Sequence, residues 1–342
     1  MVLFISQVVS ITIKDIAKML NVSHTTVSRS LNDSPLISKE TKEKVKAIAE
    51  KYNYRPNVSA RSLVLSKSYN IGLFFSTLKT GTTANFFLNS VRGVNSVIRG
   101  RYNLAVEAID DLVDFQQINP RSFDGIVVMS QSPNDDEFIA HVLKKDIPLV
   151  VLNREIIGQK VTTVLSDDLK GAYNITKYIL DQGHRDIAII EGKPEFRTTY
   201  KRKQGFLNAH ADAGLEFNEG YALPGKYDLE SGYNAMQKIL GMHELPTAIF
   251  CSNDEMALGA MKAVKQRNIA MPDEISIAGF DDMGFTAYLT PALTTVLRPV
   301  EEMSKEGAQI LLNKIANQEV VELNIINLDT KLIIRDSVKK IN

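Results

Sequence analysis

Residues 21–32, NVSHTTVSRSLN, combine five hydroxyl side chains with one His and one Arg, and only three of these residues are apolar. Two of the apolar residues are four positions apart, so a helix would turn them to one side and leave the polar side chains exposed. Short donors and acceptors on such a surface can enter the DNA major groove, which is about 12 Å wide, and contact base edges. We therefore predict a recognition helix that reads bases through His24, Thr25 and Arg29.

Hydroxyl residues also stand where two helices should begin. Thr12 precedes the first helix with Asp15 three residues later, as in a capping box, and Ser23 begins the second. The free N–H groups at such helix starts suit phosphates, although capping alone accounts for Ser23. The candidate DNA contacts of this region are Thr12, Ser23, His24, Thr25, Thr26, Ser28 and Arg29.

Polar side chains follow several strand-like runs later in the sequence. Asn153 ends PLVVLN, Asn253 ends TAIFCSN and Asp281 ends ISIAGFD. Ligands of open α/β sheets bind beyond the carboxyl ends of the strands, and amide and carboxylate groups match vicinal sugar hydroxyls. We predict a small-molecule site at these ends. Each residue also has a structural interpretation, because Asn253 could close a turn and Asp281 could cap a helix.

Charged and aromatic side chains complete this candidate site. Arg202, expected to open a helix, can bind hydroxyls bidentately, while Phe86 and Tyr227 could cover the apolar face of a sugar ring. The alternatives are a surface ion pair for Arg202 and core packing for Phe86.

Three short helices must position the recognition surface. The first covers Thr12–Leu20, and Asn21 follows at a turn position that tolerates a left-handed backbone. The third begins after Ser38, and we expect Val45, Ile48, Ala49 and Tyr52 to close its small core. The first two helices form a helix-turn-helix.

From Tyr69 onward, apolar runs alternate with helical stretches, a pattern typical of parallel βαβ units. The expected strands cover 70–76, 103–109, 125–130, 148–153, 186–192, 247–254, 275–282 and 294–299. So many strands exceed one doubly wound sheet, so we predict two α/β lobes.

The composition narrows the class of protein. Residues 1–70 carry 11 Lys and Arg against 5 Asp and Glu, whereas the whole chain carries 40 of each, so a basic head precedes an acidic body. Such a head indicates a polyanionic partner at one end of the chain. The single Cys251, expected as inert core, excludes a disulfide framework. We expect no metal, no cofactor, no export signal and no membrane span.

The order of helix-turn-helix, linker and two-lobe body resembles the LacI/GalR family of bacterial transcription regulators. The resemblance extends over about residues 11–337, through TIKDIAKMLNVSHTTVSRSLN, DGIVVMS, R-x-x-G-F at 202–206, SNDEMALGAMKAV and ISIAGFDD. It implies an all-α head followed by a type I periplasmic-binding-protein-like effector domain. The implied parts are a head at 11–56, a hinge helix at 57–68 and a body at 69–342, with an N-lobe at 69–167 and 299–327 and a C-lobe at 168–298 and 328–342.

The resemblance also implies a second DNA contact in the hinge. Two copies of a family hinge helix pair in the minor groove, where Leu63 would wedge between base steps and Ala60 would share its face. Asn57 and Arg61 are the neighbouring candidates. Leu63 as simple packing remains the alternative.

In the body the resemblance maps Arg202, Asn253 and Asp281 onto effector-contacting positions. Arg298 is a departure, because the family often has Gln there, and a guanidinium favours a carboxylate or phosphate on the ligand. The effector candidates are therefore Phe86, Asn153, Arg202, Tyr227, Asn253, Asp281 and Arg298.

Together these features predict a cytoplasmic homodimer that binds a palindromic operator and regulates carbohydrate-utilisation genes, in the family's commoner arrangement as a repressor. Its effector would be a small sugar or sugar derivative, acidic or phosphorylated if Arg298 contacts it. A partner protein or a non-sugar metabolite as the main signal is the alternative. An exported solute-binding protein would need a signal and lack the head, and an enzyme would need a motif such as G-x-S-x-G or a P-loop, none of which occurs.

Overall fold

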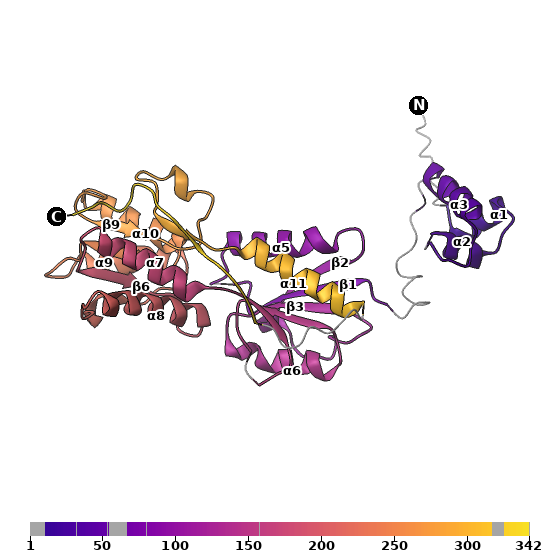
Figure 1. The fold of residues 1–342 in the computed structure, drawn as a ribbon, viewed down its shortest axis with the longest axis horizontal. Helices are drawn as coiled ribbons and strands as arrows, with labels where there is room; N and C mark the ends of the chain where they lie inside the picture. The colour runs from indigo at the N-terminus through magenta and orange to yellow at the C-terminus, as the bar shows by residue number, and fades with distance from the viewer. Residues whose placement is uncertain are drawn as a thin grey trace, which may run out of the picture. The chain divides into compact units, whose positions relative to one another are not determined.

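The computed structural model describes residues 11–31, 33–52, 54, 67–79, 81–156, 158–316 and 325–341. The chain divides into two compact units, residues 1–67 and 68–342. Figure 1 colours them from indigo at the N-terminus to yellow at the C-terminus. Within the described residues, no helix has both the length and the apolar character that crossing a membrane requires.

The first unit contains α1 (Ile13–Met19), α2 (His24–Leu31) and α3 (Lys39–Lys51). The expected capping box is confirmed, because the Thr12 amide donates to Asp15 Oδ2 at 2.8 Å and the Asp15 amide donates to Thr12 Oγ1 at 3.4 Å. Asn21 has φ +51°, so the turn uses the left-handed backbone that its type permits.

The core of this unit is small. Ile16, Val27 and Val45 are fully buried, and they join the three helices. The prediction that Tyr52 closes this core is wrong: α3 ends one residue earlier and Tyr52 is 47% exposed. Tyr54 packs against the core instead, because the chain leaves the helix before it can present Tyr52 inward.

The N-lobe of the second unit is a six-stranded parallel sheet in the order β11-β5-β4-β3-β1-β2. The strands are β1 (Asn70–Phe75), β2 (Asn103–Ala108), β3 (Gly125–Met129), β4 (Leu149–Leu152), β5 (Thr162–Ser166) and β11 (Ile325–Leu328). Helices α5 (Ala84–Ile98) and α11 (Val300–Ile315) pack on one face, and α6 (Asp136–Lys144) packs on the other (Figure 1). Both faces are covered, which explains why β3 and β4 are continuous apolar runs.

The C-lobe contains a four-stranded parallel sheet in the order β7-β6-β8-β9. Its strands are β6 (Ile187–Ile190), β7 (Ala222–Leu223), β8 (Ala248–Cys251) and β9 (Ser276–Ala278). Beside it, β10 (Thr295–Leu297) pairs antiparallel with β12 (Lys331–Ile333). Helices α7 (Asp168–Asp181) and α8 (Arg197–Asp212) share one hydrophobic core, and α9 (Leu229–Ile239) and α10 (Asp254–Gln266) share another.

The chain crosses between the lobes three times, after β5, after β10 and after β11. These crossings are tied together by hydrogen bonds. The Asp167 amide donates to the Leu328 carbonyl at 3.0 Å, Thr330 Oγ1 donates to the Asp167 carbonyl at 3.3 Å, and Arg298 Nε donates to Ser166 Oγ at 2.9 Å. The three connections therefore form one joint.

The expected fold class is confirmed, since an all-α unit precedes two α/β lobes. Each of the eight expected runs contains a strand, and Cys251 is buried in β8 as expected. The sequence did not predict β5, β7, β11 and β12, which have two to five residues each. The expectation that Arg202 opens its helix is also wrong, because α8 begins at Arg197 and Arg202 lies in its second turn.

Candidate functional site

The outward surface of α2 presents three side chains to solvent. His24, Thr25 and Arg29 are exposed, and none of them bonds with another described side chain. Val27 anchors the opposite side of the helix with no exposed surface. A rigid helix with free polar groups can donate to and accept from a partner without first breaking its own contacts.

The remaining hydroxyls of the head serve the helices themselves. Ser23 Oγ accepts from the Thr26 amide at 3.0 Å, and its hydroxyl lies 2.9 Å from Thr26 Oγ1. Thr12 is engaged in its capping box, and Ser28 is half-buried. Ser23, Thr26 and Thr12 thus have a structural role whether or not they also contact phosphates. Asn57, Ala60, Arg61 and Leu63 lie outside the described residues, so their roles in the hinge stay predictions.

A cleft between the two lobes of the second unit gathers all seven candidate effector residues. Its empty space, open mouth included, is about 330 Å³. Five further lining residues were not predicted. The lining residues are Gly81, Thr83, Phe86, Gln131, Asn153, Phe196, Thr198, Arg202, Tyr227, Asn253, Asp281 and Arg298.

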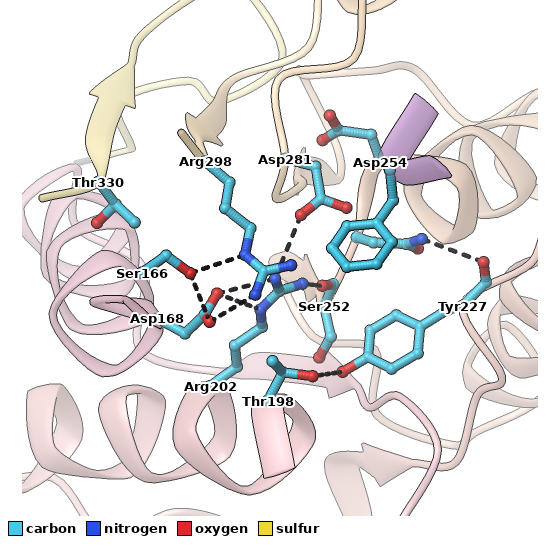
Figure 2. A network of polar contacts seen from close by, with 12 residues as sticks. Ser166, Asp168, Thr198, Arg202, Tyr227, Ser252, Asp254, Asp281, Arg298 and Thr330 are labelled. Carbon is cyan, nitrogen blue, oxygen red and sulfur yellow. Dashed lines mark hydrogen bonds and ion pairs between the residues drawn. The ribbon is translucent and has the colours of Figure 1, made fainter. Parts of the chain in front are cut away.

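Arg202 is the centre of an ion network on the C-lobe side of the cleft (Figure 2). Its side chain is 2% exposed and donates from Nη2 to Asp168 Oδ1 at 2.9 Å and to Asp281 Oδ1 at 3.2 Å. Nη1 donates to the Ser252 carbonyl, and the guanidinium lies 3.8 Å from the centre of the Phe280 ring. The surface-ion-pair alternative is therefore wrong, since the pair is buried and holds three strand ends together.

Arg298 lies beside Arg202 and joins the two lobes (Figure 2). Nε donates to Ser166 Oγ, and Nη2 donates to Asn153 Oδ1 and, at 3.0 Å, to Asp168 Oδ2. Within the described residues Nη1 has no protein acceptor. The guanidinium is thus fixed by three partners and presents two unused N–H groups in the cleft.

Burial and the two guanidiniums set the charges of the acids. Burial alone would raise the pKa of Asp168, but Arg298 and Arg202 lower it below its ordinary value. Burial raises the pKa of Asp281, partly offset by Arg202. Asp254, fully buried behind the cleft and close to Asp281, has its pKa raised far more, which favours the neutral acid.

Two lining amides are occupied by structural bonds. Asn253 is fully buried, accepts from the Met256 amide at the start of α10 and donates to the Tyr227 carbonyl. Asn153 donates to the Ser130 carbonyl and accepts from Arg298. Their contribution to the cleft is to fix neighbouring groups, which agrees with the structural interpretation of Asn253. Asp281 caps no α-helix; its φ of +112° turns its carboxylate toward Arg202.

Aromatic rings form the apolar walls. Phe196 and Tyr227 lie stacked with ring centres 6.0 Å apart, and the Arg298 guanidinium lies 5.5 Å from the centre of the Phe86 ring. Phe86 also packs in the N-lobe core, so it serves as both core and cleft wall. The walls meet at Gly81, where a Cβ would lie 2.9 Å from the Phe196 ring.

The lobes also touch directly at the cleft. The Arg197 amide donates to the Gln131 carbonyl at 3.1 Å, and Gln131 accepts from Thr82 Oγ1 at 3.1 Å. Gln131 follows β3 just as Asn153 follows β4, so the rule of strand ends could have found it. Asp168 likewise lies two residues beyond a strand, β5, but β5 was not predicted, so the rule was not applied there.

Comparisons with known proteins agree with this architecture. Residues 12–57 match the model of bacterial regulatory proteins of the lacI family, and residues 176–338 match the periplasmic binding protein-like domain. The probable HTH-type transcriptional repressor ExuR of Bacillus subtilis (strain 168) is 48% identical over 97% of this chain and 99% of its own length. The chain therefore belongs to the LacI family, as a DNA-binding transcriptional regulator.

Two solved structures share the fold over 96% of this chain and 99% of theirs. The complex of the transcriptional regulator CelR with cellobiose is 25% identical with a TM-score of 0.73. The lac repressor dimer bound to operator and the anti-inducer ONPF is 21% identical with a TM-score of 0.81. The second likeness bears on the fold alone.

Proposed function

We propose that this regulator is a cytoplasmic repressor of carbohydrate-utilisation genes whose effector is a small sugar carrying an acidic group. It acts by binding alone, as a homodimer on a palindromic operator. The proposal rests on the relatives named as repressors and on CelR, which is solved with cellobiose. The seven predicted effector residues around one cleft support it.

One observation supports the proposal that the effector carries an acidic group. Arg298 is fixed by Ser166, Asn153 and Asp168, yet its Nη1 stays unused in the cleft. A neutral sugar would be served equally well by Gln, whereas a pre-oriented guanidinium adds a charge-assisted, paired contact to a carboxylate. Asp281 supplies an acceptor for hydroxyls, and Phe86 and Tyr227 cover the ring.

On the DNA side we propose that His24, Thr25 and Arg29 read bases. Thr12, Ser23, Thr26 and Ser28 would lie at the phosphates, and Asn57, Ala60, Arg61 and Leu63 would act in the hinge. The exposed, unpaired side chains of α2 support the first assignment. Ligand and operator binding would be coupled reciprocally through movement of the lobes, typically by about 1–3 kcal/mol.

The test is fluorescence anisotropy of a palindromic duplex taken from upstream of the protein's own gene, with salt varied. Hexoses, hexuronates and hexose phosphates are titrated into the complex. We expect an acidic sugar to change operator affinity by about 5- to 150-fold. Arg298→Gln should lose the response to acidic sugars and keep its operator affinity in their absence.

Two results would overturn parts of this proposal. A response to neutral hexoses alone would remove the acidic group from the effector. Operator binding that responds to no sugar, and only to an added cell extract, would favour a partner protein or a non-sugar metabolite as the signal.

A further inference from the structure

We infer that Asp168 determines the charge selectivity of the cleft, so that it accepts one carboxylate and excludes a doubly charged phosphoryl group. The inference rests on the proposed acidic effector and narrows its chemical class. Asp168 lies between the two cleft cations: Oδ1 accepts from Arg202 at 2.9 Å and Oδ2 accepts from Arg298 at 3.0 Å. Its side chain is 5% exposed, so it faces the guanidiniums instead of solvent.

The charges of the cleft are balanced before any ligand enters. Among the described lining residues the cations are Arg202 and Arg298, and the anion is Asp281. Asp168 behind them supplies the second negative charge. Burial alone would raise the pKa of Asp168, but the two guanidiniums lower it below its ordinary value, so Asp168 stays ionised. One carboxylate therefore leaves an excess of one negative charge, and a phosphoryl dianion leaves an excess of two.

The unused N–H donors of the two cleft arginines also favour a carboxylate over a phosphoryl group. Arg202 directs Nε, Nη1 and Nη2 to protein acceptors, and Arg298 keeps only Nη1 unused. Two N–H groups on one nitrogen can serve one or two carboxylate oxygens, but not the three oxygens of a phosphoryl group. Lys193 lies 5.3 Å from the centre of the Phe196 ring but is not among the lining residues. It pairs with Glu195 at 3.9 Å, so the two together add no net charge beside the cleft.

Asp168→Asn removes one negative charge while keeping the size of the side chain. A unit charge within about 10 Å, at an effective dielectric of about 20, changes the affinity for each ligand charge by about tenfold or more. The variant should therefore gain about tenfold more affinity for a dianion than for a monoanion. Asp167→Asn is the matched control, because Asp167 caps α7 through the Lys170 amide at 3.0 Å and Asn keeps that cap.

The experiment is calorimetric titration of the full-length protein with four probes from the hexose series that shifts operator binding. They are the hexose, its uronate, its 6-sulfate and its 6-phosphate. The sulfate and the phosphate have the same shape, but the sulfate carries one charge and the phosphate about two. The wild type should bind the sulfate about tenfold or more tightly than the phosphate, and Asp168→Asn should remove this preference while Asp167→Asn keeps it.

Equal wild-type affinities for the sulfate and the phosphate would overturn the inference. This comparison uses only the wild-type protein, so it tests the inference even if Asp168→Asn fails to fold. A folded Asp168→Asn that keeps the wild-type preference would overturn it as well. Either result leaves the acidic effector intact if the uronate still binds more tightly than the hexose. Tighter binding of the hexose would instead overturn the proposed effector.

Discussion

The recognition helix and the effector cleft both use Arg and short polar residues, but they hold them in opposite ways. The side chain of Arg29 on α2 is exposed and bonds with no other described residue, whereas that of Arg202 in the cleft is 2% exposed and binds two carboxylates and a carbonyl. The head presents free groups on a minimal core. The cleft presents groups whose positions depend on one another. A substitution on the exposed surface of α2 should therefore change binding without changing stability, whereas a substitution in the cleft network should change both.

The largest effect should follow from breaking the cleft network. Arg202→Ala leaves Asp168 and Asp281 buried without their common partner, and removing one member of a buried ion pair costs about 3–5 kcal/mol. Urea unfolding of the body would measure the loss. Arg197→Ala on the same helix is the control, because its side chain is exposed and should change stability by less than about 0.5 kcal/mol. If Arg202→Ala and Arg197→Ala lowered the free energy of unfolding equally, the cleft network would not stabilise the body, and the contrast with the head would be lost.

The next effect concerns the head and should leave stability unchanged. Arg29→Ala should weaken operator binding by about 1–3 kcal/mol, and relax specificity if Arg29 contacts a base, with unfolding within about 0.5 kcal/mol of the wild type. Anisotropy on operator and scrambled duplexes separates the two cases. Lys44→Ala is the control, since Lys44 is paired with Glu40 at 2.6 Å. A loss of head stability in Arg29→Ala would show that the surface of α2 is not free.

A smaller effect should expose the structural role of Ser23. Ser23→Ala removes the acceptor of the Thr26 amide and should lower the stability of the head by about 1 kcal/mol. Ser23→Asn restores a capping oxygen and should recover that stability. Thermal unfolding followed by circular dichroism measures both, and an Asn variant as unstable as the Ala variant would contradict the capping role.

The smallest effect is a change in pH dependence. Burial raises the pKa of Asp254 above its unfolded value, so its contribution to stability is present at low pH and is lost as pH rises through the folded pKa. Asp254→Asn can keep the contacts with the Met283 amide and Thr295 Oγ1 and should not show this loss. The free energy of unfolding, variant minus wild type, should rise as the pH increases above the ordinary range of an aspartate pKa. A difference that stays flat would contradict the raised pKa of Asp254.

The same contrast explains how much the sequence could predict. On the head, helix caps and spacing are local, so Thr12, Ser23, Ser38 and the exposed surface of α2 follow from neighbouring residues. The prediction for Tyr52 was wrong because the residue at which α3 ends determines which of the two nearby tyrosines, Tyr52 or Tyr54, packs against the core.

In the cleft, the ends of strands led to residues that the structure brings together, including Asn153, Asn253 and Asp281. Asp168 follows β5 but was missed because that strand was not predicted. Its role could not be predicted either, because it depends on two arginines that are 34 and 130 residues away in sequence. Short edge strands such as β7 and β11 also depend on distant partners, and the sequence missed them for the same reason.

The most direct test of the account compares Arg29→Ala and Arg298→Gln in two assays, operator binding without sugar and sugar-acid binding without DNA. The account predicts that Arg29→Ala loses operator affinity and keeps sugar-acid affinity, while Arg298→Gln does the reverse. In the operator complex, Arg298→Gln should then fail to respond to the sugar acid. If Arg298→Gln loses operator affinity as fully as Arg29→Ala, or binds the sugar acid as the wild type does, the cleft does not act as the effector site proposed for it.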